Sequence, residues 1–132
     1  MLLEHLSEPW LAAVDAELAA RDRLRPHAAE CAVGITQVVT GGTDPLVYHF
    51  SSHGGSARVA WGAAAPEDVR IVEDRSTAAA IATGRTNAGE AFITGRVVVS
   101  GDRQRLVAAR SLLAAFDDAM SSVAACTRFD DA

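Results

Sequence analysis

The spacing of apolar residues changes twice along the chain, and this change most constrains the fold. Near the start, Trp10, Val14 and Leu18 recur at every fourth position, which places them on one face of an α-helix. Ser7 is positioned to cap this helix and Pro26 to end it. The spacing of apolar residues then falls to every second position, as in a β-strand. In the second half of the chain it returns to the spacing of a helix. The sequence therefore predicts a helix, then strands, then further helices.

Five segments are predicted to be β-strands, and turn-forming segments separate the first ones. They are residues 31–39, 46–50, 56–61, 69–73 and 96–100. The first four are expected to form a meander, in which each strand pairs with the next. Cys31 is expected to open the first of them as a small buried side chain.

The second half of the chain predicts three more helices. Gly84 is positioned to end the first of them and Gly95 to end the second, which Asn87 caps. One long helix is expected from Asp102 to Met120, because apolar residues recur there on one face. The last six residues are expected to be frayed.

These elements predict one α+β domain over residues 1–132, with a five-stranded, mostly antiparallel sheet and helices packed on one face. A chain of 132 residues is long enough for one core, and no repeat or linker divides it. Apolar residues make up 49% of the sequence but aromatic residues only 5%, so small aliphatic side chains must build the interior.

The charge of the chain excludes some classes of partner. Its formal net charge is -5, whereas nucleic acids and anionic membranes attract basic surfaces. No segment approaches the roughly 18 apolar residues of a membrane span, and the start lacks the pattern of a secretion signal. We therefore expect a cytoplasmic protein that does not bind nucleic acid and is not an integral membrane protein.

Nucleotide and metal sites are not indicated either. Gly84 and Gly89 have the spacing of a phosphate loop, but Glu90 follows where that motif needs lysine. His49 and His53 are four residues apart, yet they fall in a predicted strand and a predicted glycine turn, with no third ligand nearby in the sequence. No cofactor and no metal are therefore expected.

The sequence also lacks the patterns of an enzyme active site. No G-x-S-x-G elbow accompanies the segment HGGS at residues 53–56, which is predicted to be a turn. Asp117 and Asp118 are adjacent on a predicted helix and point in different directions, which favours a solvated face over a catalytic pair. We therefore expect a protein without catalytic activity.

One segment contains a motif of the form A-F-x-x-G-[KR]-φ-x-φ-x-G-[DN], where φ is an apolar residue. Its residues in this chain are Ala91, Phe92, Gly95, Arg96, Val97, Val99, Gly101 and Asp102. Residues 68–113, which contain the motif, resemble the sterol carrier protein 2 family, and within it a bacterial domain. The first half of the chain agrees with that family only in the order of its elements.

The resemblance implies an apolar tunnel between the sheet and the helices. In that family such tunnels bind fatty acids, acyl-CoA, sterols or other lipids without transforming them. The residues that the resemblance makes candidates for ligand binding are Ile81, Phe92, Ile93, Val97, Val99, Leu113, Phe116 and Met120. Three arginines are candidates either to pair with a lipid carboxylate at the tunnel mouth or to be solvated surface residues: Arg75, Arg85 and Arg96.

Other functions are consistent with the same residues. An ordinary close-packed core would show the same spacings, and the abundance of alanine favours a collapsed cavity. The chain would then be a structural or interaction module with a filled core, in which Trp61 or Val47 contributes to a homodimer interface. It would alternatively be an accessory partner of an enzyme.

Overall fold

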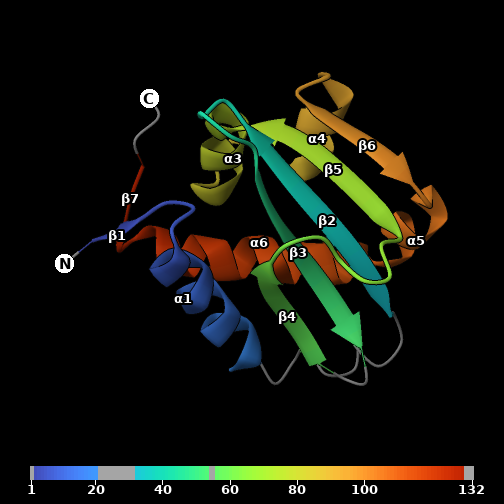
Figure 1. Ribbon diagram of the computed structural model, residues 1–132, viewed down its shortest axis with the longest axis horizontal. Helices are drawn as coiled ribbons and strands as arrows, with labels where there is room; N and C mark the ends of the chain where they lie inside the picture. Colours follow the sequence, from blue (N-terminus) through green and yellow to red (C-terminus); the bar gives the residue numbers. More distant parts are fainter. Residues whose placement is uncertain (1, 21–31, 54–55, 130–132) are drawn as a thin grey trace.

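The structure is a computed structural model that describes residues 2–20, 32–53 and 56–129 (Figure 1). Three features predicted from the sequence lie outside the described residues. These are the end of the first helix at Pro26, the start of a strand at Cys31 and the two glycines of the predicted turn at residues 54–55.

A five-stranded sheet forms the centre of the molecule (Figure 1). Its strands are β2 (Val33–Thr40), β3 (Leu46–His53), β4 (Ser56–Trp61), β5 (Val69–Asp74) and β6 (Val97–Gly101). Their order is β4-β3-β2-β5-β6, and every pairing is antiparallel except that of β2 with β5. The predicted α+β class with a mostly antiparallel sheet is confirmed. The predicted meander is wrong, because β5 pairs with β2 and not with β4.

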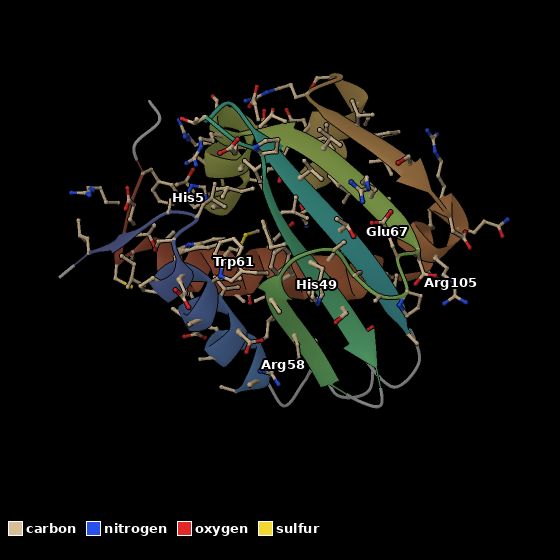
Figure 2. All side chains as sticks on the ribbon, viewed as in Figure 1. His5, His49, Arg58, Trp61, Glu67 and Arg105 are labelled. Carbon is tan, nitrogen blue, oxygen red and sulfur yellow. The ribbon has the colours of Figure 1, made fainter. Side chains whose placement is uncertain are left out.

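Helix α1 (Glu8–Ala19) packs beside β4 and occupies its free edge (Figure 1). Ser7 caps α1, as predicted. The Asp15 carboxylate accepts a hydrogen bond of 3.0 Å from the backbone N–H of Val59 and one of 2.6 Å from the guanidinium of Arg58, which lies beside α1 (Figure 2). Helix α1 and this side chain therefore cover the edge of β4, and β5 pairs with β2 on the other side of the hairpin.

The segment between β4 and β5 carries the chain back across the outer face of the sheet (Figure 1). The Ala64 N–H donates to the hydroxyl of Thr36, a fully buried residue of β2, at 3.0 Å. Gly34 allows the close approach, because a Cβ at that position would collide with the Pro66 carbonyl oxygen. The crossover therefore depends on one small residue in β2.

The later helices are α3 (Arg75–Ala82), α4 (Ala88–Ile93), α5 (Arg103–Ala108) and α6 (Arg110–Ala124). Asn87 and Asp102 cap α4 and α5, as predicted, through hydrogen bonds from backbone N–H groups three residues further on. Gly84 and Gly95 follow α3 and α4 with φ values of 78° and 79°, in the left-handed region that glycine tolerates. These predicted helix ends are confirmed.

The long helix predicted from Asp102 is two helices, α5 and α6, which meet at Ala109. Helix α5 packs against β5, whereas α6 crosses the face of the sheet and packs against α1 and α3 (Figure 1). One straight helix cannot make both sets of contacts, so the chain changes direction at Ala109, which is fully buried. The period of apolar residues continues through the break, which is why the sequence did not reveal it.

Two short strands pair near the ends of the chain. β1 (Leu3–Glu4) lies parallel to β7 (Thr127–Arg128). The prediction of a frayed C-terminus is therefore wrong for the two residues of β7, while residues 130–132 lie outside the described part. Strands of two residues are too short to show a periodic pattern in the sequence.

Candidate ligand-binding cavity

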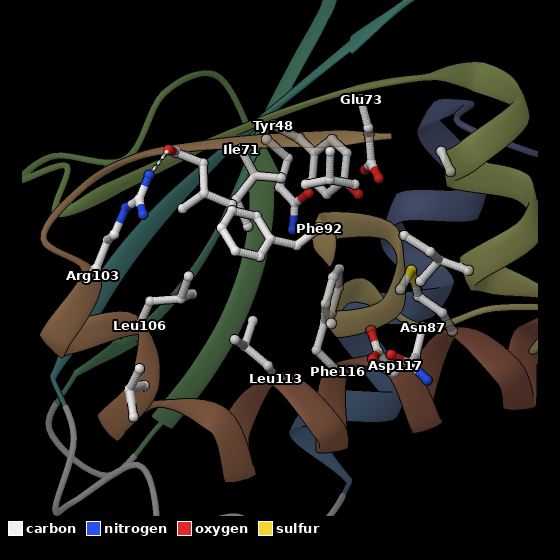
Figure 3. Close-up of a pocket in the computed structure, with 18 of the residues that line it drawn as sticks. Tyr48, Ile71, Glu73, Asn87, Phe92, Arg103, Leu106, Leu113, Phe116 and Asp117 are labelled. Carbon is white, nitrogen blue, oxygen red and sulfur yellow. Dashed lines mark hydrogen bonds between the residues drawn. The ribbon is translucent and has the colours of Figure 1, made fainter. Parts of the chain in front are cut away.

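A cavity of about 430 Å³ lies between the sheet and the helices α3 to α6 (Figure 3). Most of its wall is apolar. Ile71 on β5 and Val97 and Val99 on β6 point into it, whereas Val98 points to the other face of the sheet and is 63% exposed. The alternation of side chains along a strand thus places every second valine of β6 in the wall.

Helix α6 forms the opposite wall. Leu113, Phe116 and Met120 are three and four positions apart and therefore share one face of the helix. The Phe116 ring stacks on that of Phe50 from β3, with centroids 4.9 Å apart, so the core fixes its position. On α3, Ala78 borders the cavity with a side chain of one carbon. The abundance of alanine in the sequence favoured a collapsed cavity, but at this position the alanine side chain lies beside open space.

Seven of the eight residues predicted to bind a ligand border the cavity. They are Ile81, Phe92, Val97, Val99, Leu113, Phe116 and Met120. The eighth, Ile93, is 83% exposed and does not border it. Successive residues of a helix point about 100° apart, so Phe92 and Ile93 cannot both face the same space. The placement of Ile93 in the wall is wrong, and ligand binding by the other seven stays a prediction.

The cavity opens beside α4 and α5. Phe92 and Val107 border it there and are 43% and 62% exposed. The Arg103 guanidinium lies 5.6 Å from the centre of the Phe92 ring and donates to the Val99 carbonyl oxygen at 3.5 Å (Figure 3). The three arginines considered for the mouth do not border this cavity: Arg75, Arg85 and Arg96. Arg103 is at the mouth in their place.

The inner end of the cavity is polar. Gln37 on β2, Tyr48 on β3 and Glu73 on β5 border it and are 6%, 2% and 6% exposed. Within the described part of the chain, these three side chains form no hydrogen bond to another residue. Asp117 lies opposite them on α6 (Figure 3). Polar groups from both layers therefore meet at one end of a mostly apolar space.

Burial raises the pKa of both carboxyl groups at this end. The pKa of Glu73 rises from 4.5 to about 7, first through desolvation and then through repulsion from Asp117 and Asp74. Desolvation raises the pKa of Asp117 from 3.8 to about 6. Burial, followed by the charges of Glu73 and Asp117, also raises the pKa of Tyr48 well above its usual value. The prediction of a solvated face holds for the exposed Asp118 but is wrong for Asp117.

Sequence reasoning missed Glu73, although the strand period contains the signal. Val69, Ile71 and Glu73 alternate along β5, and all three are buried on its inward face. In the same way Gln37 falls between Ile35 and Val39 on the inward face of β2. A polar residue at an inward position of a strand is therefore the pattern that predicts the polar end.

Among the described residues, no three His, Cys, Asp or Glu side chains are grouped so that they could hold a metal ion. His49 does not border the cavity, and its Nδ1 donates to the Gly62 carbonyl oxygen at 3.0 Å. His53 is the last residue of β3, so its placement in a glycine turn is wrong. In the part of the chain that the structure describes, no helix is long and apolar enough to cross a membrane.

The fold and the cavity define the class of the protein: a small α+β domain with an apolar space between one sheet and its helices. The model of the SCP-2 sterol transfer family matches residues 10–114. The chain therefore belongs to the SCP-2 sterol transfer family, and the predicted family is confirmed. No curated protein matches the chain at a significant level.

Several solved structures share the fold. A conserved hypothetical protein from Thermus thermophilus matches with a TM-score of 0.74 and 18% identity, over 92% of this chain and 90% of its own. Sterol carrier protein 2 from Yarrowia lipolytica, in its apo form, has a TM-score of 0.63 and 15% identity, over 83% and 88%. Palmitated SCP2L2 from Aedes aegypti has a TM-score of 0.59 and 18% identity, over 86% and 92%. At such low identities the likeness shows the fold alone.

Proposed function

We propose that this domain binds a lipid or another hydrophobic molecule in the cavity and carries it without chemical change. The observation that carries the proposal is a cavity of about 430 Å³ with a mostly apolar wall and a mouth beside α4 and α5. Small-molecule sites have volumes of roughly 300–1,000 Å³ and walls of this kind. Membership of a sterol transfer family supports the same class of ligand, as does the description of one structural relative as palmitated.

The apolar wall supplies enough binding energy by itself. Burying an acyl chain of about ten methylenes gains on the order of 8 kcal/mol before ordering costs, at ~0.8 kcal/mol per methylene. After those costs, an affinity in the micromolar range is expected. A carrier needs this moderate affinity, because its ligand has to leave again.

The side chains around the cavity favour binding over catalysis. In the described part of the chain, no serine, threonine or cysteine borders the cavity. Among the same residues the only hydroxyl is that of Tyr48, and burial raises its pKa and so disfavours its ionised form. A nucleophile activated by an oriented base is the usual sign of covalent catalysis, and the residues bordering the cavity do not provide one.

The experiment is native mass spectrometry of the protein purified from its own host, followed by displacement of a fluorescent lipid probe. We expect a retained hydrophobic molecule in the mass spectrum and displacement of the probe at micromolar concentrations of unlabelled lipid. Protein that is ligand-free and also fails to bind the probe would contradict the proposal.

A second candidate function is a module that pairs with another copy of the chain. It is favoured by Trp61 on the edge strand β4, which is 40% exposed (Figure 2). Size-exclusion chromatography with light scattering would then show a dimer, and Trp61→Arg would convert it to a monomer. A monomeric wild-type protein would exclude this function.

A further inference from the structure

The inner end of the cavity contains hydrogen-bonding groups that the described part of the protein leaves unused. Gln37, Tyr48 and Glu73 are each more than nine-tenths buried, and none forms a side-chain hydrogen bond to another described residue. A space lined with hydrogen-bonding groups that the described residues leave unused is therefore suited to the polar group of a ligand. On the Asp117 side it adjoins a second, more open pocket, which Asn87 and Arg85 also line.

The charge at this end is negative. Glu73 and Asp117 project into it from β5 and α6 (Figure 3). Neither carboxyl group forms an ion pair with a residue that the structure describes. Among the described residues, the basic side chains that border the cavity are Arg103, which lies at the mouth beside Phe92, and His5. A cationic group of a ligand would therefore meet two carboxyl groups that the described protein does not neutralise.

The ring of His5 packs against other aromatic side chains. It lies edge-on to Trp10, with centroids 5.0 Å apart, and tilted against Phe129 at 4.6 Å. Tyr48 is in turn edge-on to Trp10 at 6.3 Å. On the side of His5 and Tyr48, the wall of the cavity is thus supported by packed rings.

We infer that the inner end of the cavity binds the hydrogen-bond-donating polar group of an amphiphile, a protonated amine in preference to an alcohol, and disfavours a free carboxylate. This inference rests on the proposed function and specifies the ligand class of the same cavity. An ammonium group donates three hydrogen bonds, and the Glu73 and Asp117 carboxylates and the Gln37 amide oxygen are acceptors. An alcohol donates one. A carboxylate donates none and adds a third negative charge.

Burial increases the discrimination between these ligands. Charges interact more strongly in the low-dielectric interior of a protein than in water, for attraction and for repulsion. The apolar part of the ligand would lie along Val99, Leu113 and Phe116 toward the mouth, and it contributes equally for every polar group. A series of ligands with one chain length therefore isolates the effect of the polar group.

The experiment measures displacement of Nile red, a neutral probe, from the full chain at pH 8 by decylamine, decanol and decanoate below their micelle concentrations. An alkylamine is protonated at this pH, as lysine is. We expect decylamine to bind at least tenfold more tightly than decanoate, with decanol between them. Glu73→Gln and Asp117→Asn should each reduce the ratio of amine to carboxylate affinity at least fivefold. Asp118→Asn is the matched control, because this neighbour is exposed and does not border the cavity, and it should leave the ratio unchanged.

The outcomes separate the inference from the function on which it rests. If decanoate binds as tightly as decylamine, or if the amine preference persists in the Glu73→Gln, Asp117→Asn double variant, the inference is overturned and the carrier function stands. If none of the three ligands displaces the probe, both are overturned. Thermal unfolding of each variant confirms that it is folded before its affinities are compared.

Discussion

Glu73 is a carboxylic acid at a position where the strand geometry otherwise places apolar side chains. It follows Val69 and Ile71 on the inward face of β5, and it is 6% exposed. Its pKa of about 7 means that the folded protein favours the neutral form, whereas the unfolded chain ionises near 4.5. An acid at this position beside the cavity therefore makes the stability of the protein depend on pH.

The sign of this effect follows from proton binding. Between pH 4.5 and about 7 the folded protein holds a proton on Glu73 that the unfolded chain has lost. The free energy of unfolding therefore falls as the pH rises through this window, by about 3 kcal/mol for a shift of this size. Asp74, Asp117 and Tyr48 are the titratable groups that interact with Glu73, and the raised pKa of Asp117 acts in the same direction at lower pH.

We predict that Glu73→Gln removes most of the stability loss between pH 5 and pH 8. The glutamine is neutral throughout, so the variant should be more stable than the wild type at pH 8 and similar to it at pH 5. Urea unfolding at the two pH values measures the difference, and Asp118→Asn should behave as the wild type. A wild-type protein that is as stable at pH 8 as at pH 5 would show that the carboxyl group is not desolvated.

The sequence predicted the apolar residues of the site better than its acids. Phe92 and Val97 were found because the family motif and the strand period agree on their positions. Asp117 was assigned to solvent from its adjacency to Asp118, since directions along one helix do not reveal which side meets a cavity. Which side of α6 faces the cavity depends on the residues packed opposite it. One of these, Glu73, lies 44 residues earlier in the chain.

The elements themselves were predictable, whereas their pairing was not. Each of the five predicted strands corresponds to a strand of the sheet, because each has its own period and its own turns. The position of β5 depends instead on long-range contacts. The Asp15 carboxylate binds the backbone N–H of Val59 on the edge of β4, and the Ala64 N–H binds the hydroxyl of the buried Thr36. None of these contacts has a local signature in the sequence.

The contact between α1 and the edge of β4 leads to a second prediction. Asp15→Ala should lower the free energy of unfolding by about 1–3 kcal/mol, because the partly buried Val59 N–H loses its acceptor. Arg58→Ala should lower it by less than about 1 kcal/mol, because the Arg58 side chain is 64% exposed and the ion pair is screened by solvent. Denaturant unfolding of both variants at neutral pH makes the comparison.

The comparison of the two variants tests which contact holds α1 on the edge strand. If Arg58→Ala is as damaging as Asp15→Ala, the ion pair and not the backbone hydrogen bond holds α1 on the edge strand. The Arg58 guanidinium also lowers the pKa of Asp15 through its hydrogen bond. This contribution to stability is therefore present above pH 3.8 and is lost as the pH falls through the lowered pKa.

At the scale of the whole molecule, the cavity departs from the close packing of protein interiors. The core on the α1 side is filled, with Trp10 and Val14 at 1% and 0% exposure. On the α3 side Ala78 and Ile81 border the cavity, and about 430 Å³ remains open between the sheet and the helices. The small side chain of Ala78 thus maintains the space that the proposed function requires.

The last prediction tests whether that space is functional. Ala78→Leu adds three carbons where the structure has room, so the free energy of unfolding should change by less than about 1.5 kcal/mol, as in tolerated core substitutions. Lipid affinity should fall at least tenfold, because the added side chain occupies the volume that the ligand's methylenes would fill. Ala114→Leu, the same change at an exposed position of α6, is the matched control and should leave both quantities unchanged. Probe displacement and urea unfolding on the three proteins provide the test. Undiminished lipid affinity in folded Ala78→Leu would place the ligand outside this cavity, whereas loss of affinity with stability retained would locate it between the sheet and the helices.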